Sequence, residues 1–352
     1  MTFRKVTAPG ALCLAAGVIV AVSAPQAWDV STDAGRTAVL DGLSQTALAA
    51  HVGYLASDEL QGRATPSAGL DLAAKYIAGE FKKAGLKPVA GESYFQQAKF
   101  TSRDGTEYHA SNVIGILEGS DAKLKDTFIL LSAHYDHLGN NPRIEGDSIY
   151  NGANDNASGT AGVIQLAHAL SKAKPRRSIV FIGFCGEERG LLGSRYYGRN
   201  PVVPLKQTIC QINLEQIGRF DEVGAPQPVK GSMTGFDFSD VGPLFSKAAQ
   251  AVGTDIQKHP QNSDAFFSRS DNQSLADLGI PAHTICGAYV FPDYHRPSDH
   301  ADKLDYKTMA TLLKGIAVGV LTIADSDRAP QWNADNPKAA KYLAAWRALH
   351  GN

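Results

Sequence analysis

Two adjacent glutamates, Glu187 and Glu188, follow an apolar run in the string RSIVFIGFCGEERG. Adjacent carboxylates repel each other, so the pair raises the question of what charge offsets the repulsion. Further polar side chains follow other apolar runs or stand in the loops beside them. These residues are His134, Asp136, Asp155, Glu215 and His295. Histidine and carboxylate together are the ligand types that zinc and similar divalent ions use in proteins.

The number of candidate ligands indicates how many metal ions the chain can hold. One zinc ion with an open position needs three protein ligands, whereas this sequence offers more. The candidates are His134, Asp155, Glu188, Glu215 and His295. Such a set fits two metals about 3.5 to 4 Å apart that share one carboxylate. Asp155 fits the bridge best, because the glycines in NGANDNASG let the backbone approach closely.

Short apolar runs rich in Ile, Val, Phe and Leu predict the strands that position these residues. The runs are NVIGILEG, DTFILLSA, RSIVFIGF, TICQINL and IPAHTICG. The spacing of apolar residues predicts helices within residues 41–61, 68–84, 157–173, 306–325 and 337–349. A strand, a helix and a strand in this order imply a right-handed crossover. The sequence therefore predicts an α/β fold with a mainly parallel central sheet sandwiched by helices.

The composition is that of a globular protein. Of the 352 residues, 43% are hydrophobic, which supplies a large core, and the formal net charge of -1 argues against a nucleic-acid binder. Residues 1–24 begin with Arg4 and Lys5, continue with an apolar stretch and end with small residues, as a secretory signal peptide does. The apolar stretch is shorter than the ~20 residues that span a bilayer. We therefore expect residues 25–352 to form one exported domain, periplasmic or secreted, without stable membrane association.

Six strings in a fixed order resemble the motifs of the M28 zinc aminopeptidases and their di-zinc relatives. They are SAHYDHLG, NGANDNASG, GFCGEERGLLGS, INLEQIG, FSRSDNQSLADLGIPA and DYHRPSDH, and the resemblance covers residues 41–325. It implies a mixed, mainly parallel sheet sandwiched by helices, peptide substrates and two zinc ions. By this resemblance His134 and Glu215 bind one zinc ion. Glu188 and His295 bind the other, with Asp155 as the bridge.

The same resemblance implies roles for two further residues. Glu187 falls at the family's general base, which takes a proton from a water molecule that the two metals share. Asp136 is expected to hydrogen-bond the His134 ring and to fix its tautomer. His137, in the same string, can likewise hydrogen-bond a metal ligand without binding the metal itself. His300 is interpreted as an exposed loop residue, with a substrate contact as the alternative.

Two residues depart from the family's pattern. Glu215 stands where many relatives carry aspartate, and its extra methylene changes the spacing available at that metal. Phe267 stands where some aminopeptidases place a tyrosine that steadies the tetrahedral oxyanion. Another hydrogen-bond donor must then serve in its place. The candidates are Tyr289, Tyr294 and Arg269.

The favoured interpretation is an exported di-zinc exopeptidase, and among exopeptidases an aminopeptidase, because a carboxylate-rich centre attracts a free ammonium group. A carboxypeptidase needs a cationic clamp, and only Arg189 and Arg296 stand next to the motifs. A glutaminyl cyclase on the same fold uses one zinc ion, so counting metals distinguishes it. A non-catalytic binding domain is the less favoured alternative, because this chain carries the whole ligand set and the base.

Overall fold

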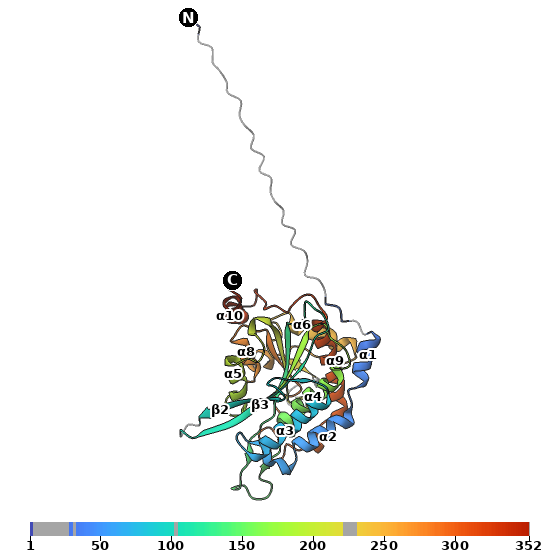
Figure 1. Cartoon of the computed structure of the whole chain (residues 1–352), viewed down its shortest axis with the longest axis vertical. Helices are drawn as coiled ribbons and strands as arrows, with labels where there is room; N and C mark the ends of the chain where they lie inside the picture. Colours follow the sequence, from blue (N-terminus) through green and yellow to red (C-terminus); the bar gives the residue numbers. More distant parts are fainter. Residues whose placement is uncertain (3–27, 31–32, 102–104, 221–230, 352) are drawn as a thin grey trace.

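A computed structural model describes residues 1–2, 28–30, 33–101, 105–220 and 231–351. Nearly all of the expected signal peptide, residues 3–24, lies outside the described residues, so its cleavage stays a prediction. Within the described part, a central sheet lies between two layers of helices (Figure 1). This architecture confirms the predicted α/β fold.

The central sheet is mixed, with a parallel core. Its strand order is β1-β3-β7-β4-β8-β10-β9, and β2 pairs with β3. The strands are β1 (Lys87–Pro88), β2 (Phe95–Thr101), β3 (Glu107–Leu117), β4 (Phe128–His134), β7 (Ser178–Phe184), β8 (Thr208–Glu215), β9 (Ser232–Met233) and β10 (Ala282–Cys286). Strands β7, β4, β8 and β10 run parallel, whereas β1, β2, β3 and β9 join by antiparallel pairing. A separate small sheet pairs β5 (Gly139–Asn140) with β6 (Ile149–Tyr150).

Helices cover both faces of the sheet (Figure 1). One layer contains α1 (Ala34–Asp41), α2 (Gln45–Leu55), α3 (Ala68–Lys83), α4 (Gly159–Leu170), α6 (Val241–Ala251) and α9 (Tyr306–Ala324). The other contains α5 (Leu192–Arg199), α8 (Asn272–Ala276) and α10 (Ala340–His350). Shorter helical segments are α7 (Asn262–Ala265), η1 (Asp58–Arg63), η2 (Ala153–Ser158), η3 (Leu205–Gln207), η4 (Ala301–Lys303) and η5 (Pro337–Ala339).

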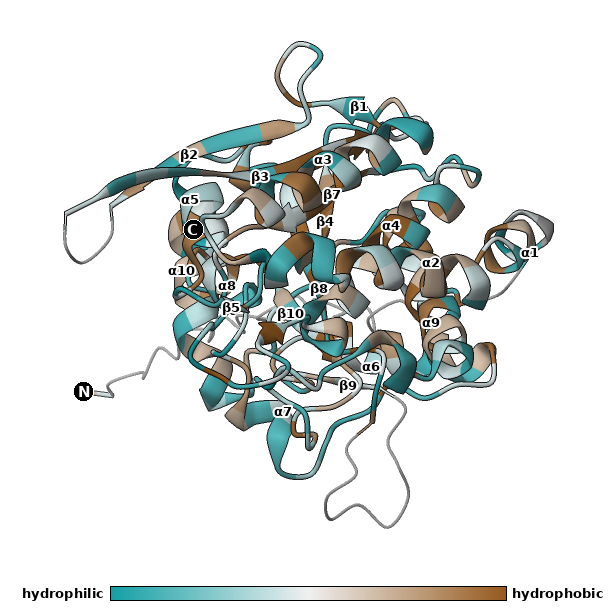
Figure 2. Cartoon of the chain, turned by 90° about the horizontal axis from the view of Figure 1, so that it is seen from below, coloured by the Kyte–Doolittle hydropathy of each residue, from teal (hydrophilic) through white to brown (hydrophobic). Residues whose placement is uncertain are grey.

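The central strands are apolar on both sides because each side faces a helix layer. Along β7, Ile179 and Phe181 belong to the core shared with α2, α3, α4 and α9. Val180 and Ile182, which point the opposite way, belong to the core shared with α5, α8 and α10. Figure 2 shows apolar residues gathered on β4 and β7 between the helices. The continuous apolar runs of the sequence therefore mark strands that are buried on both faces.

The ends of the predicted helices follow ordinary capping chemistry. α3 begins after Ser67, whose hydroxyl accepts a hydrogen bond from the N–H of Leu70 at 3.0 Å. α9 begins after Asp305, whose carboxylate accepts from the N–H of Thr308 at 3.0 Å. α9 is long and apolar enough to cross a membrane by composition alone, but 78% of its most apolar window is buried inside the protein. Packing against α2 and α6 therefore accounts for its apolar composition.

Candidate active site and metal centre

The polar residues singled out in the sequence meet at one edge of the sheet. β4 ends at His134 and β8 ends at Glu215, while the turn after β7 carries Glu187 and Glu188. His134 lies beside Phe184, the last residue of β7, in the parallel register. Because these strands are parallel, their carboxyl ends open toward the same side. The strand ends therefore deliver these side chains to one crevice.

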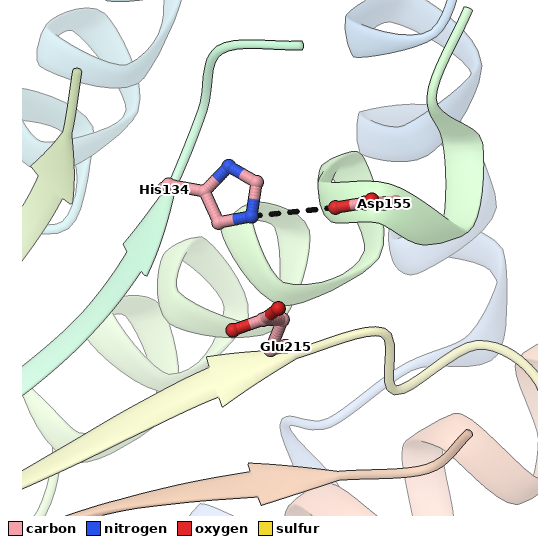
Figure 3. Close-up of side chains that lie close together, drawn as sticks. All are labelled: His134, Asp155 and Glu215. Atoms are coloured by element: carbon pink, nitrogen blue, oxygen red, sulfur yellow. Dashed lines mark ion pairs between the residues drawn. The ribbon is translucent and has the colours of Figure 1, made fainter. Parts of the chain in front are cut away.

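A first group of possible metal ligands consists of His134, Asp155 and Glu215, which come from β4, η2 and β8 (Figure 3). Their ligand atoms all lie within 4.8 Å of one another, and His134 Nε2 is 3.3 Å from Asp155 Oδ1. His134 Nε2 and Glu215 Oε2 are buried and have no hydrogen-bond partner within the part of the chain that the structure describes. Buried polar atoms normally have a partner, so these two atoms fit metal ligands. The longer side chain of Glu215 still reaches the group.

A second group surrounds the other oxygen of Asp155. His295 Nε2 lies 3.2 Å from Asp155 Oδ2 and 3.3 Å from Glu188 Oε2. His137, Asp155 and Glu188 also form a set whose ligand atoms lie within 4.8 Å of one another. Asp155 thus belongs to both groups, with Oδ1 toward His134 and Oδ2 toward His295. This is the arrangement expected of a carboxylate that bridges two metal ions.

The backbone around Asp155 is held in place by a buried carboxylate and a glycine. Asp299 Oδ2 accepts hydrogen bonds from the N–H groups of Asn154 and Asp155, at 3.0 and 3.1 Å. Gly152 has a φ of +58°, and a side chain there would collide with the Asp155 carbonyl oxygen and with the His137 ring. The close backbone approach expected around Asp155 is therefore present. Asp299 was not among the candidate site residues of the sequence.

Arg63 also holds the backbone near Asp155 in place. It is fully buried, and its guanidinium group donates to the carbonyl oxygens of Tyr135, Asn151 and Gly152 at 2.7 to 3.0 Å. It also donates to the carbonyl oxygen of Leu55. A buried cation so close to the carboxylate cluster has a structural role, because it fixes the segments that carry His134 and Asp155.

His137 takes a larger part in the site than the sequence indicated. Its ring is almost fully buried, and Nδ1 lies 2.8 Å from Glu188 Oε1, whereas Nε2 has no hydrogen-bond partner. His137 thus contacts Oε1 of Glu188, whereas His295 lies near Oε2 of the same carboxylate. The only sequence signal for this contact is the string HYDH, in which a second histidine follows His134 by three residues.

Asp136 contacts the turn after β7 more closely than it contacts the His134 ring. Its Oδ1 accepts a hydrogen bond from the main-chain N–H of Glu187 at 3.0 Å, and its Oδ2 accepts from the Thr65 hydroxyl at 3.1 Å. His134 Nδ1 lies 3.6 Å from Asp136 Oδ1 but 3.2 Å from the main-chain oxygen of Asp136. The ring is therefore oriented mainly by a backbone carbonyl, and the carboxylate orients Glu187.

The electrostatics of this cluster show an excess of buried negative charge. Burial raises the pKa of Glu187 well above its usual value and raises the pKa of Glu215 to about 7, with neighbouring carboxylates adding to both effects. Burial also raises the pKa of Asp271 to about 6. Burial alone would raise the pKa of Glu188, but hydrogen bonds from His137 and His295 hold this pKa below its usual value. Bound divalent cations would offset this charge.

A cavity of about 260 Å³ opens beside the cluster. Its lining includes Asp155, Glu187, Glu215 and His295, and also the three candidates for the oxyanion donor, Tyr289, Tyr294 and Arg269. Phe267 is 2% exposed and packs with Phe238 and Tyr342 in the core on the α5, α8 and α10 side, so it contributes nothing to the cavity. His300 is partly exposed and pairs with Asp147 at 3.0 Å, in agreement with a loop position.

Two lining residues, Gln216 and His295, have a backbone conformation that non-glycine residues rarely adopt. Their φ angles are +52° and +54°, in the left-handed region. The main-chain oxygen of Gln216 accepts from the N–H groups of Gly287 and Ala288 at 3.1 and 3.2 Å, which holds this conformation. Strained residues of this kind concentrate at functional sites, where the surrounding structure aims a side chain. Both side chains here are aimed at the cavity.

The paired ligand groups at the carboxyl ends of the parallel strands are of the types that bind divalent metal ions. Residues 112–320 match the profile described as Peptidase family M28, and the chain belongs to this family. Aminopeptidase YwaD of Bacillus subtilis is 28% identical over 255 residues, which cover 70% of this chain and 52% of YwaD. A probable zinc metalloprotease of Pyrenophora tritici-repentis is 29% identical over 258 residues, which cover 70% of this chain and 56% of that protein. The chain thus spans about half the length of these two relatives.

Solved structures with the same fold include aminopeptidases. The LapA aminopeptidase of Legionella pneumophila superposes with a TM-score of 0.64 at 18% identity, over 87% of this chain and 78% of LapA. A zinc aminopeptidase of Bacillus subtilis, BSAP, gives a TM-score of 0.63 at 17% identity, over 82% of this chain and 97% of BSAP. A glutaminyl cyclase of Bacteroides thetaiotaomicron gives 0.59 at 20% identity, over 81% of this chain and 99% of that protein. These likenesses confirm the α/β fold.

Proposed function

We propose that this chain is an exported aminopeptidase that binds two zinc ions and hydrolyses the amino-terminal peptide bond of peptides. The observation that carries the proposal is the position of Asp155, whose two oxygens face two separate groups of ligand atoms. Asp155, Glu215 of one group and His295 of the other line a cavity together with Glu187. A shared carboxylate beside a candidate base is what a two-metal hydrolase requires.

The residues present fit two zinc ions. His134, Glu215 and Asp155 would hold one ion, and Glu188, His295 and Asp155 would hold the other. Nitrogen and carboxylate oxygen are ligands that zinc accepts, and the unpartnered atoms His134 Nε2 and Glu215 Oε2 match this use. When bound, zinc acts as a Lewis acid that polarises a carbonyl group and makes water more acidic.

Glu187 is the group that moves protons. Its carboxylate lines the cavity, and its backbone is fixed through the Asp136 hydrogen bond. Burial raises the pKa of Glu187 well above its usual value, so the carboxyl group holds a proton more readily than an exposed glutamate does. Glu187 therefore takes a proton from the attacking water and passes it to the nitrogen of the leaving amine.

The oxyanion that forms at the substrate carbonyl needs a hydrogen-bond donor. The Tyr294 ring stacks on the His295 ring, with 3.9 Å between the ring centres. Burial and the neighbouring carboxylates Asp155 and Glu188 raise the pKa of Tyr294, so its hydroxyl stays protonated. We assign the donor to Tyr294, because among Tyr289, Tyr294 and Arg269 it packs directly on a ligand residue.

An amino-terminal preference follows from the charge of the cavity. Asp155, Glu187 and Glu215 supply negative charge to its lining, whereas Arg269 is its one cationic side chain among the described residues apart from histidine. A free ammonium group is attracted to such a site. The name of the relative YwaD supports the same activity.

A panel of substrates tests this function. The purified protein, loaded with zinc, should hydrolyse aminoacyl p-nitroanilides and free peptides from the amino terminus, and should leave amino-acetylated peptides intact. Cleavage of acetylated peptides together with resistance of carboxyl-amidated ones would establish a carboxypeptidase instead. Conversion of an amino-terminal glutamine to pyroglutamate without hydrolysis would establish a glutaminyl cyclase, the activity named for one structural neighbour.

Export is proposed from residues 1–24, which have the pattern of a signal peptide. Expression of the full chain in a bacterial host should yield a mature form in the periplasm or the medium that lacks the first two dozen residues or so. Amino-terminal sequencing of the fractionated protein measures this directly. A membrane-bound form that still starts at Met1 would contradict cleavage and support an anchor.

A further inference from the structure

We infer that the cavity selects peptides whose first residue is aspartate or glutamate, and that Arg269 recognises the side-chain carboxylate. The inference rests on the proposed aminopeptidase function and names its substrate class. It depends on a cation, an aromatic platform and a polar lining, all within the same cavity. None of these features serves the proton transfer assigned to Glu187.

Arg269 is a cation without a carboxylate partner. Its side chain lines the cavity and is exposed, and no carboxylate within residues 33–101, 105–220 or 231–351 lies at ion-pair distance from it. Other arginines are paired: Arg219 contacts Asp293 at 2.7 Å, and Arg176 contacts Asp121 at 2.8 Å. A guanidinium group that borders a binding cavity without a protein partner is available to a carboxylate of the substrate.

The guanidinium group lies over an aromatic ring that itself packs against a second ring. The Arg269 Cζ atom lies 4.9 Å from the centre of the Phe266 ring, and the Phe266 ring lies 4.9 Å from the Tyr289 ring. This contact places the ring against the guanidinium group, whose N–H groups can donate in pairs to a planar ligand. The side chain is thereby prepared for a planar, two-oxygen ligand.

The inner lining of the cavity is also suited to a polar side chain. Gln216 is 4% exposed and lines the cavity, and its Oε1 has no hydrogen-bond partner among the described residues. Rotation of the amide exchanges the positions of its oxygen and its NH2, so the NH2 can face the cavity. The Thr234 hydroxyl oxygen accepts from the N–H of Thr284 at 3.0 Å, which leaves the hydroxyl hydrogen to donate. A leucine side chain would cover these groups without satisfying them, and such a mismatch is costly. A carboxylate can accept from Thr234 and from the NH2 of a rotated Gln216 amide.

The cavity places this cation near the group of carboxylates. Arg269 precedes Ser270, and both residues line the cavity together with Glu215. The guanidinium group and the carboxylates of Asp155, Glu187 and Glu215 therefore border one small space with opposite charges. An amino-terminal aspartate or glutamate has the matching pair, an ammonium group and a side-chain carboxylate, on a single residue.

Kinetics of the full-length protein with alanine, leucine, lysine, glutamine, aspartate and glutamate p-nitroanilides test the inference. We expect the highest kcat/KM for glutamate or aspartate, at least about tenfold above glutamine, since a charged hydrogen bond is worth that factor or more. Arg269→Met should lower the ratio of kcat/KM for glutamate to that for alanine by about 10- to 100-fold. Arg269→Glu should invert the preference toward lysine, and Arg269→Lys should restore part of the acidic preference.

A matched control and a second substrate pair separate the alternatives. Arg195 on α5 is exposed and lies outside the cavity lining, so Arg195→Met should leave the glutamate-to-alanine ratio unchanged. An unchanged ratio in Arg269→Met would overturn the inference. A second result would also overturn it: Arg269→Met lowers kcat/KM for the dipeptide Ala-Gly but not for Ala-Gly amide. Arg269 would then bind the terminal carboxylate of the peptide. Hydrolysis of alanine p-nitroanilide without acidic preference rejects only this inference, whereas no hydrolysis of any anilide rejects the aminopeptidase function as well.

Discussion

The carboxylate of Asp136 accepts a hydrogen bond from the main-chain N–H of Glu187 at 3.0 Å. This contact ties the end of β4 to the turn after β7 and fixes the residue proposed as the base. Asp136→Ala should therefore lower kcat by about 10- to 100-fold, the usual effect of removing a group that orients a functional residue. The zinc content should stay the same, because His134 Nδ1 is held mainly by the main-chain oxygen of residue 136.

The conservative variant Asp136→Asn keeps an oxygen acceptor for the Glu187 N–H and should recover most of kcat. Steady-state kinetics and zinc content per chain, measured on both variants, show whether Asp136 acts through the Glu187 N–H or through the His134 ring. If Asp136→Ala lost one zinc ion instead, the carboxylate would act through the His134 ring.

The two adjacent glutamates are expected to respond differently to the same substitution. Glu187→Gln should keep the zinc content and the fold while lowering kcat by about 10²-fold or more, the scale of general acid-base catalysis. Glu188→Gln should weaken zinc binding, because Glu188 lies against His137 and His295. Metal analysis after dialysis, together with kcat, distinguishes the two effects. Zinc loss in Glu187→Gln, or near-normal kcat in that variant, would reverse or reject the assignment.

His137 offers a test of whether it holds Glu188 or binds metal itself. Asparagine can place an N–H near the position of Nδ1, so His137→Asn should keep the contact with Glu188 and retain zinc affinity. His137→Ala should weaken zinc binding by about 10- to 100-fold. Competition with a chromogenic chelator measures both affinities. If both variants lost zinc affinity to the same extent, His137 Nε2, which has no hydrogen-bond partner among the described residues, would be a zinc ligand.

His283 should make the fold sensitive to acid. It is fully buried on β10, bonded to Ser239 and to the Thr234 carbonyl, and burial lowers its pKa from 6.5 to about 4. Between pH 6.5 and 4 the unfolded chain binds a proton that the folded chain does not, so stability falls as the pH falls through this window. From pH 7 to pH 5 the loss is about 2 kcal/mol. Urea unfolding of His283→Gln should lack this part of the pH dependence, and an unchanged dependence would contradict it.

The sequence predicted the sheet core and the meeting of His134 with Glu215 for the same physical reason. Strands buried on both faces appear as continuous apolar runs, and the polar residue that follows such a run stands at the strand's carboxyl end. His134 and Glu215 could therefore be assigned to one crevice before the structure was known. α3 and α9 were equally predictable, because their apolar stripes and capping residues are local features.

Other features depend on contacts that periodicity does not encode. β2 is a half-exposed strand with the polar sequence FQQAKFT, and it forms with β3 a long hairpin that extends beyond the helices (Figures 1 and 2). The supporting roles of His137 and Asp299 arise from segments far apart in the chain, which meet only through irregular loops. Arg63 bonds to main-chain carbonyl groups, which no side-chain pattern reveals.

Zinc titration tests the two-metal account most directly. The protein is stripped with a chelator, zinc is added back in steps, and bound zinc per chain is measured alongside the hydrolysis of alanine p-nitroanilide. Because Asp155 faces two ligand groups, activity should rise until about two zinc ions are bound per chain. His134→Ala and His295→Ala should each lose about one ion. Full activity with a single tightly bound zinc ion would contradict the account.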